Sequence, residues 1–267
     1  MKWYLTVLTV VSLFVSVSAL AQESPQSMLN EGKVAQADQA LLRMSANADE
    51  EVAVEGLCGR AQLALSKKDT AKAGEYLDQA IGKLDQLKKK SGWRVIPLWM
   101  KADLARQAGD DDESLKLVQK AQEAIAGGAR VEDDWKGMVL YLQSQVDQDN
   151  ESAREAAEDA AKAFEKSGLY VEQGNALIRL MILELDRKKE KKAVKAYDAA
   201  MKAFGKAENS AYWEASCELQ FALHLAKADM MDSAAKRYES AKERVVLANN
   251  PKDLKKLSNE IDALLPY

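Results

Sequence analysis

A short pattern of small and large apolar residues recurs along the chain and constrains its fold more than any other feature. At Ala73, Leu77 and Ala80 the pattern is small, apolar, small at positions i, i+4 and i+7, which lie on one face of an α-helix. The same pattern returns as Ser114, Val118, Ala121, as Ala193, Tyr197, Ala200, and as Ala234, Tyr238, Ala241. This repetition predicts an array of similar helices.

The spacing of the copies indicates a repeat of two helices. The first small residue of each copy lies at Ala37, Ala73, Ser114, Ala153, Ala193 and Ala234, with spacings of 36, 41, 39, 40 and 41 residues. A period near 40 is typical of solenoids built from helical hairpins. Three of the five full units, which leave out the copy at Ala37, also have an alanine twelve residues earlier, where the two helices of a hairpin must approach closely: Ala61, Ala102 and Ala222. Tyr141 and Met181 occupy this position in the other two copies and do not fit.

Composition agrees with an all-α fold. The chain has four prolines, none of them between Pro97 and Pro251, and no segment after the first 21 residues alternates like a strand. After a helical turn around Met28, the expected helices span about 33–45, 49–66, 70–90, 93–108, 132–148, 150–166, 170–186, 190–206, 210–227, 231–248 and 253–265. A further helix is expected to begin at the acids 110–113.

Several residues mark the expected helix ends. Asp69 or Thr70 and Asn150 are candidate N-caps, and Gly109 and Gly168 are candidate stops. Lys88, Lys89 and Lys90 are expected at the carbonyl end of helix 70–90, where the helix dipole favours cations. The final helix carries one apolar stripe, which is expected to cover the last repeat: Leu254, Leu257, Ile261 and Leu264.

The first 21 residues have the features of a cleaved secretory signal. Lys2 is followed by an apolar run over 5–17 and by Ala19-Leu20-Ala21, which offers small residues at the two positions a signal peptidase reads. The mature chain is expected to start near Gln22; an uncleaved membrane anchor is the alternative, because 3–21 is nearly long enough to span a bilayer. The expected organisation is a signal at 1–21, a leader and capping helix at 22–48, repeats at 49–248 and a closing helix at 249–267. The style of the signal indicates a bacterial protein that is periplasmic or secreted.

Charge and cysteine usage limit the classes of partner. Without Lys2, the chain has 37 basic and 42 acidic residues, and this acidic balance argues against nucleic acid or an anionic membrane as the main partner. Cys58 and Cys217 lie about four repeats apart, farther than the roughly 7 Å that a disulfide can span. Both cysteines are therefore expected to be free and buried.

The sequence predicts no catalytic centre, no cofactor and no metal site. His224 is the one histidine, and Cys217 lies two helical turns, about 10 Å, before it, too far for the hydrogen bond that activates a thiol. The acids 110–113 lack the alternating ligands of a calcium loop. The basic run 187–192 lies at a helix start, where the dipole disfavours it, so it is either a contact for a partner or a solvated loop.

The segment 68–80 resembles the second helix of a tetratricopeptide repeat (TPR), and Leu57, Ala61 and Ala64 resemble the matching first helix. Leu98, Ala102 and Ala105, followed by Ser114, Val118 and Ala121, are similar again. The resemblance covers about residues 49–248; the units depart from the family in being longer than its roughly 34 residues and in lacking its usual closing proline. It implies a right-handed superhelical solenoid.

In solenoids of this family the first helices line a concave face that binds peptides. The resemblance places eight residues on that face: Cys58, Trp99, Met138, Leu142, Ile178, Ile182, Leu219 and Leu223. Two structural alternatives are that these side chains pack on neighbouring helices, or that helix 253–265 folds back over them.

The predicted function is that of an exported, non-enzymatic scaffold that binds a partner peptide or helix on this face. The alternative is a structural subunit of a cell-envelope assembly or a homo-oligomer.

Overall fold

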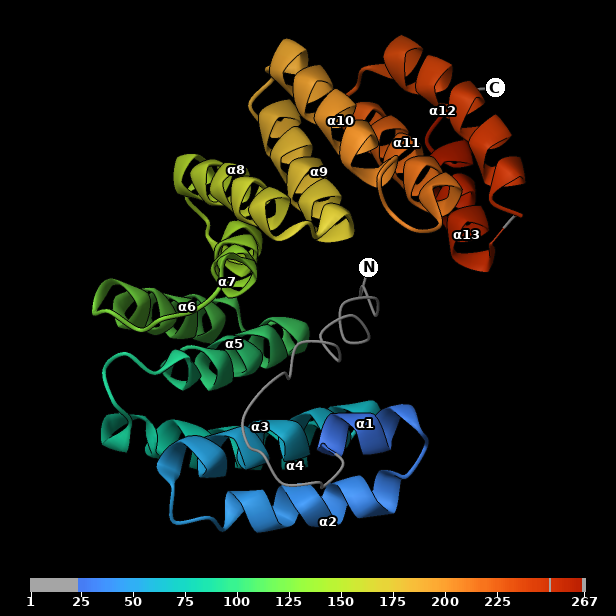
Figure 1. Cartoon of the computed structure of the whole chain (residues 1–267). Coiled ribbons are helices and arrows are strands. Elements are labelled where there is room, and N and C mark those ends of the chain that lie inside the picture. Colours follow the sequence, from blue (N-terminus) through green and yellow to red (C-terminus); the bar gives the residue numbers. More distant parts are fainter. Residues whose placement is uncertain (1–23, 250, 266–267) are drawn as a thin grey trace. The chain divides into compact units, whose positions relative to one another are not determined.

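The computed structural model describes residues 24–249 and 251–265, and this part of the chain is all-α, without a strand (Figure 1). Successive helices pack against each other as hairpins, as predicted for a helical-repeat solenoid. The chain divides after Val131 into two compact units, each of which has its own packed helices. The predicted signal lies outside the described residues. Among the described helices, none has the length and apolar character needed to cross a membrane.

Residues 24–131, the described part of the first unit, form six α-helices. They are α1 (Pro25–Asn30), α2 (Val34–Ser45), α3 (Glu50–Ser66), α4 (Thr70–Gly82), α5 (Ile96–Ala108) and α6 (Asp111–Ala126). Each of them packs on the next in the chain, and α3 with α4 and α5 with α6 form the two repeat hairpins.

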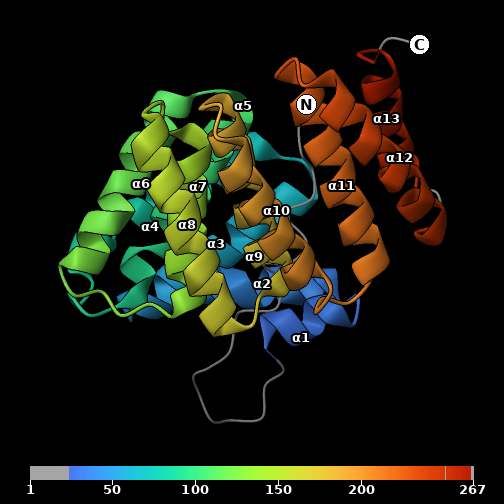
Figure 2. The same cartoon turned by 90° about the horizontal axis from the view of Figure 1, so that it is seen from above.

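The described residues of the second unit, 132–249 and 251–265, form seven α-helices. They are α7 (Asp133–Val146), α8 (Asn150–Ser167), α9 (Tyr170–Asp186), α10 (Glu190–Phe204), α11 (Ser210–Lys227), α12 (Met231–Leu247) and α13 (Lys252–Asp262). Three hairpins, α7 with α8, α9 with α10, and α11 with α12, follow one another. The helix α13 packs on α11 and α12 and ends the array (Figure 2).

The repeated small residues form the seams between these helices. Ala73, Leu77 and Ala80 are completely buried on α4, and the first and last residues of the later copies are buried to the same degree. An alanine at these positions allows the backbones of neighbouring helices to approach, which is why the pattern recurs.

Glycines provide the close approach in the two copies where the sequence pattern did not fit. A Cβ atom built on Gly137 of α7 would lie 2.7 Å from the ring of Phe164 on α8. A Cβ atom on Gly174 of α9 would lie 2.4 Å from the ring of Phe204 on α10. Both phenylalanines are completely buried. In these hairpins a glycine paired with an aromatic ring therefore replaces the alanine contact.

Aspartates cap the beginnings of several helices. Asp69 Oδ1 accepts a hydrogen bond from the Lys72 amide at 3.0 Å, as predicted. The predicted cap Asn150 is wrong: the residue before it, Asp149, accepts from the amides of Glu151 and Ser152 at 2.8 and 3.0 Å. A carboxylate placed one residue earlier reaches both free amides of the first turn.

Gly109 and Gly168 end their helices as predicted. Each adopts the left-handed conformation, with φ of 85° and 70°, which glycine reaches without steric penalty.

Two predicted helix boundaries are wrong around 83–95. The helix α4 ends at Gly82, not at Lys90, so Lys88, Lys89 and Lys90 are exposed beyond it and do not sit on its carbonyl end. The side chains of Leu84 and Leu87 turn into the core, and Arg94 Nη1 donates hydrogen bonds to both of their carbonyl groups. The helix α5 begins at Ile96, three residues later than predicted.

The closing helix matches its predicted stripe in three of four residues. Leu254, Leu257 and Ile261 are buried, but Leu264 lies beyond the end of α13 and is 40% exposed.

Candidate functional site

Six of the seven predicted partner-binding residues are buried in the free protein. They lie on first helices of the hairpins, and less than a tenth of each is exposed: Trp99, Met138, Leu142, Ile178, Leu219 and Leu223. Cys58, on the same predicted face, is fully buried. The seventh residue, Ile182 on α9, is partly exposed. Binding of a partner to these residues stays a prediction, and Ile182 is the one that a partner reaches without rearrangement of the helices.

In the second unit three of the buried members, Ile178, Leu219 and Leu223, divide between two clusters. Ile178 packs in a cluster with side chains of α10 and α11, against which Ile182 also packs. Leu219 and Leu223 belong to a different cluster, with Leu254 and Leu257 of α13. The closing helix therefore covers the last two predicted residues, which is one of the structural alternatives for this face.

A stripe of partly exposed residues runs along α9. Glu172, Asn175, Arg179 and Ile182 follow one another at spacings of three and four, and all four are partly exposed. These spacings place them on one face of the helix, which we call the α9 stripe. Other residues of α9 pack on α8 and α10, and α9 also contacts α11 and α7. The α9 stripe therefore combines polar, charged and aliphatic groups that are accessible from outside the fold.

A single hydrogen bond joins the side chain of Arg179 to the end of α7. Its Nε donates to the carbonyl oxygen of Ser144, at the end of α7, at 2.7 Å. In the part of the chain that the structure describes, no carboxylate lies within ion-pairing distance of its guanidinium group. Burial lowers the pKa of Arg179 below its ordinary value, and electrostatic interactions with Tyr141 and Asp186 oppose this effect only in part. The group nevertheless stays protonated at neutral pH, because an arginine does not lose its proton in proteins.

The positive charge of Arg179 also acts on His224 of α11. Burial is the main cause, and the positive charges of Lys227 and Arg179 act in the same direction; together they lower the pKa of His224 to about 4. At neutral pH the imidazole is therefore uncharged, and it has one nitrogen that donates and one that accepts hydrogen bonds. The site joins a permanent cation to a neutral polar ring.

The other buried charged cluster of this unit is internally paired. Glu218 of α11 is 1% exposed and accepts a hydrogen bond from the hydroxyl group of Tyr197 on α10. Arg237 of α12 lies 3.5 Å from the carboxylate of Glu218 and stacks over the Tyr197 ring at 4.5 Å. Because its charges are matched inside the fold, this cluster holds α10, α11 and α12 together and offers nothing to a ligand.

The thiols lie in surroundings that oppose reactivity. Cys58 and Cys217 are free and fully buried, as predicted. Burial raises the pKa of both thiols, and the nearby Glu218 raises that of Cys217 further. The nucleophilic thiolate is therefore suppressed.

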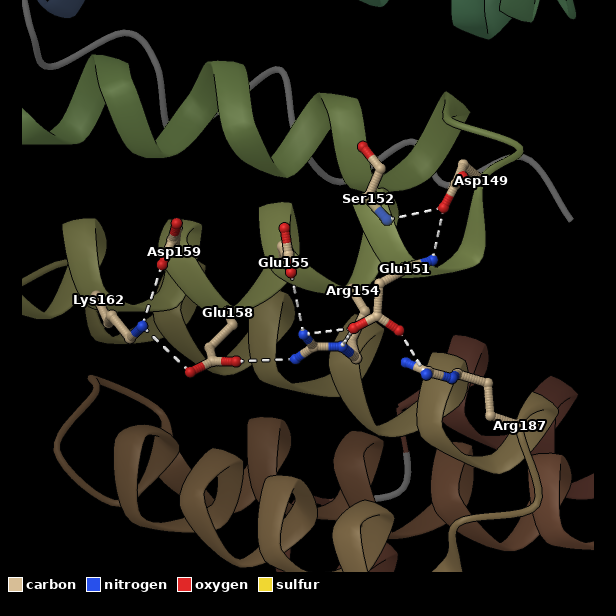
Figure 3. Close-up of polar contacts among 9 residues, drawn as sticks. All are labelled: Asp149, Glu151, Ser152, Arg154, Glu155, Glu158, Asp159, Lys162 and Arg187. Atoms are coloured by element: carbon tan, nitrogen blue, oxygen red, sulfur yellow. Dashed lines mark hydrogen bonds and ion pairs between the residues drawn. The ribbon is translucent and has the colours of Figure 1, made fainter.

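The basic run 187–192 contributes partly to the fold. Figure 3 shows Arg187 paired with Glu151 of α8, beside a chain of ion pairs along that helix. In that chain Arg154 lies 2.8 Å from Glu151 and 3.0 Å from Glu158, which Lys162 approaches at 3.1 Å. Exposed pairs three or four residues apart stabilise a helix modestly, by about 0.2–0.5 kcal/mol each. Contact of the remaining lysines with a partner stays a prediction.

The acids at 110–113 have a structural role at the beginning of α6. Asp110 Oδ1 accepts a hydrogen bond from the Glu113 amide at 3.0 Å and so caps the helix. Over residues 24–249 and 251–265, no group of three potential ligands is arranged to hold a metal ion.

Comparison with known proteins supports the fold. No protein-family model matches the chain. No curated protein matches it either. Among solved structures, the crystal structure of a Rap protein complexed with competence and sporulation factor is similar, with a TM-score of 0.56 and 18% identity. The match covers 90% of this chain and 74% of the Rap chain. At this identity the likeness concerns the fold, which is that of a TPR-like helical repeat protein.

Proposed function

We propose that this protein is an exported, non-enzymatic scaffold that binds a segment of a protein partner on the α9 stripe and the first helices beside it. The observation that carries the proposal is the α9 stripe itself: it is accessible, mixed in character and flanked by first helices, whereas the buried apolar residues around it already have packing partners. Such a surface suits an extended or helical segment of a partner. The Rap structure, whose protein is complexed with another factor, is consistent with this use of the fold.

Site-specific photo-crosslinking tests the location of the site. The photoreactive residue p-benzoylphenylalanine is introduced at Ile182 in cells of the source organism, and at Lys195, an exposed position on α10, as the matched control. We expect a discrete protein adduct from position 182 only, and its loss when Arg179→Glu is added. Equal adducts at both positions, or none at 182, would contradict the proposed site.

The purified mature chain is used to test the alternative of a structural subunit. Light scattering coupled to size-exclusion chromatography gives the oligomeric state of the mature chain at micromolar concentration. A monomer counts against a permanent homo-oligomer and favours the binding scaffold.

A further inference from the structure

Arg179 differs from every other partly buried arginine of the described chain. Arg154, Arg187, Arg237 and Arg244 in the same unit each have a carboxylate partner, and so do Arg60, Arg94 and Arg106 in the first unit. The two remaining described arginines, Arg43 and Arg130, are exposed to water. Arg179 is therefore the one partly buried arginine among the described residues that has no ion-paired carboxylate. A charge that is partly withdrawn from water is stabilised by a partner of opposite sign.

We propose that Arg179 binds the carboxylate of an Asp or Glu side chain within the partner segment, and that Ile182 contacts an aliphatic residue next to that acid. The inference rests on the proposed function and specifies the chemistry of the partner.

The geometry of Arg179 suits this role. The hydrogen bond from Nε to the Ser144 carbonyl fixes the plane of the guanidinium group and leaves its two terminal nitrogens for a ligand. A planar fork with two free donors matches the two oxygens of a carboxylate. Because the side chain is already held, less conformational entropy is lost on binding than for a mobile surface arginine.

The neighbouring charges favour a carboxylate over a phosphate group. Glu172 and Asp186 lie two helical turns on either side of Arg179, each about 10 Å away along α9. Two acids at this distance oppose a doubly charged phosphate more strongly than a singly charged carboxylate. They also disfavour a partner with several consecutive acids. The expected ligand has one acid next to an aliphatic residue.

Binding of a peptide library to the full mature chain tests the proposal. The probe is a library of 12-residue peptides with amidated C-termini, selected against the wild type, Arg179→Gln, Arg179→Glu and the control Lys195→Glu. We expect the wild type and Lys195→Glu to select peptides with one fixed Asp or Glu beside an aliphatic residue. Changing that acid to its amide is expected to weaken binding about tenfold to a hundredfold.

The variants distinguish a direct contact from a general loss of structure. Circular dichroism first establishes that each variant is folded. Arg179→Gln is expected to weaken binding by the same factor as the amide peptide, with little further loss when both changes are combined. Arg179→Glu is expected to select Lys or Arg in place of the acid.

Two outcomes overturn the inference, and they differ in what they leave standing. Peptides that bind equally well with the amide, or equally well to Arg179→Gln, overturn the role of Arg179 but leave the scaffold function intact. A library that yields no binder, while peptides with free C-termini bind, shows that a terminal carboxylate is the ligand and also overturns the proposal. The absence of any peptide binder overturns both the inference and the proposed function.

Discussion

At the scale of single residues, burial decides the charge of His224, the one histidine of the chain. Its pKa in the folded protein is lowered to about 4, whereas an unfolded chain has a histidine pKa near 6.5. Between these two values the unfolded chain binds a proton that the folded protein does not bind. The contribution of His224 to the free energy of unfolding is therefore fully present above about pH 6.5, and it is lost as the pH is lowered toward 4.

The pH dependence of stability should change when His224 is replaced. We expect the free energy of unfolding of the wild type to fall by about 2 kcal/mol more than that of His224→Gln between pH 7 and pH 4.5. Urea denaturation at the two pH values measures the difference, and the variant serves as the control for titrating carboxylates. Parallel losses in the two proteins would show that His224 is not buried in the neutral form.

The same scale explains why Arg179 was not among the predicted site residues. The prediction relied on apolar residues of the first helices, and six of the seven predicted residues are buried in the core. Arg179 lies only three positions from the predicted Ile182, so a search of the same helical face for charged residues would have included it. Its surroundings, however, depend on the backbone carbonyl of Ser144 on α7 and on His224 of α11, and no local sequence pattern specifies those contacts.

At the scale of helices, close packing depends on two pairs of glycine and phenylalanine. An alanine in a helix interior normally stabilises it relative to glycine, by about 1 kcal/mol. At Gly174 the added methyl group would overlap the fully buried Phe204 ring, so the sign should reverse. We expect Gly174→Ala to lower the free energy of unfolding by about 1–3 kcal/mol, measured by urea denaturation.

A matched glycine gives the control for this prediction. Gly82, at the end of α4, has no atom within 4 Å of the position of an added Cβ, so Gly82→Ala should be neutral or slightly stabilising. The double variant Gly174→Ala/Phe204→Leu, in which a smaller aliphatic side chain replaces the ring, should recover part of the lost free energy of unfolding. A stability gain in Gly174→Ala would contradict the proposed close contact.

At the scale of the whole molecule, the export component of the proposal depends on the first residues. We expect mass spectrometry of the protein isolated from its source to find an N-terminus at Gln22. Replacing the small residues in Ala19→Leu/Ala21→Leu should block cleavage, whereas Leu20→Ser, between them, should not. An uncleaved wild-type chain recovered with membranes would favour the anchor in place of the signal.

The sequence by itself determined the class of this protein. The recurrence of small and apolar residues with a period near 40 predicted the helical hairpins, because residues at i, i+4 and i+7 must share a helix face whatever surrounds it. Most helix limits followed from local causes, such as Asp69 as a cap and Gly109 and Gly168 as stops.

Only the tertiary structure decided which parts of the first helices remain accessible. Leu219 and Leu223 have the same apolar character as Ile182, yet α13 covers the first two while Ile182 stays partly exposed. Likewise, α4 stops at Gly82 because Leu84 and Leu87 are drawn into the core. Accessibility and ion pairing arise from contacts between residues far apart in the chain, and a periodic pattern carries no information about them. For that reason the fold could be read from the repeat, while Arg179 and its unmatched charge could not.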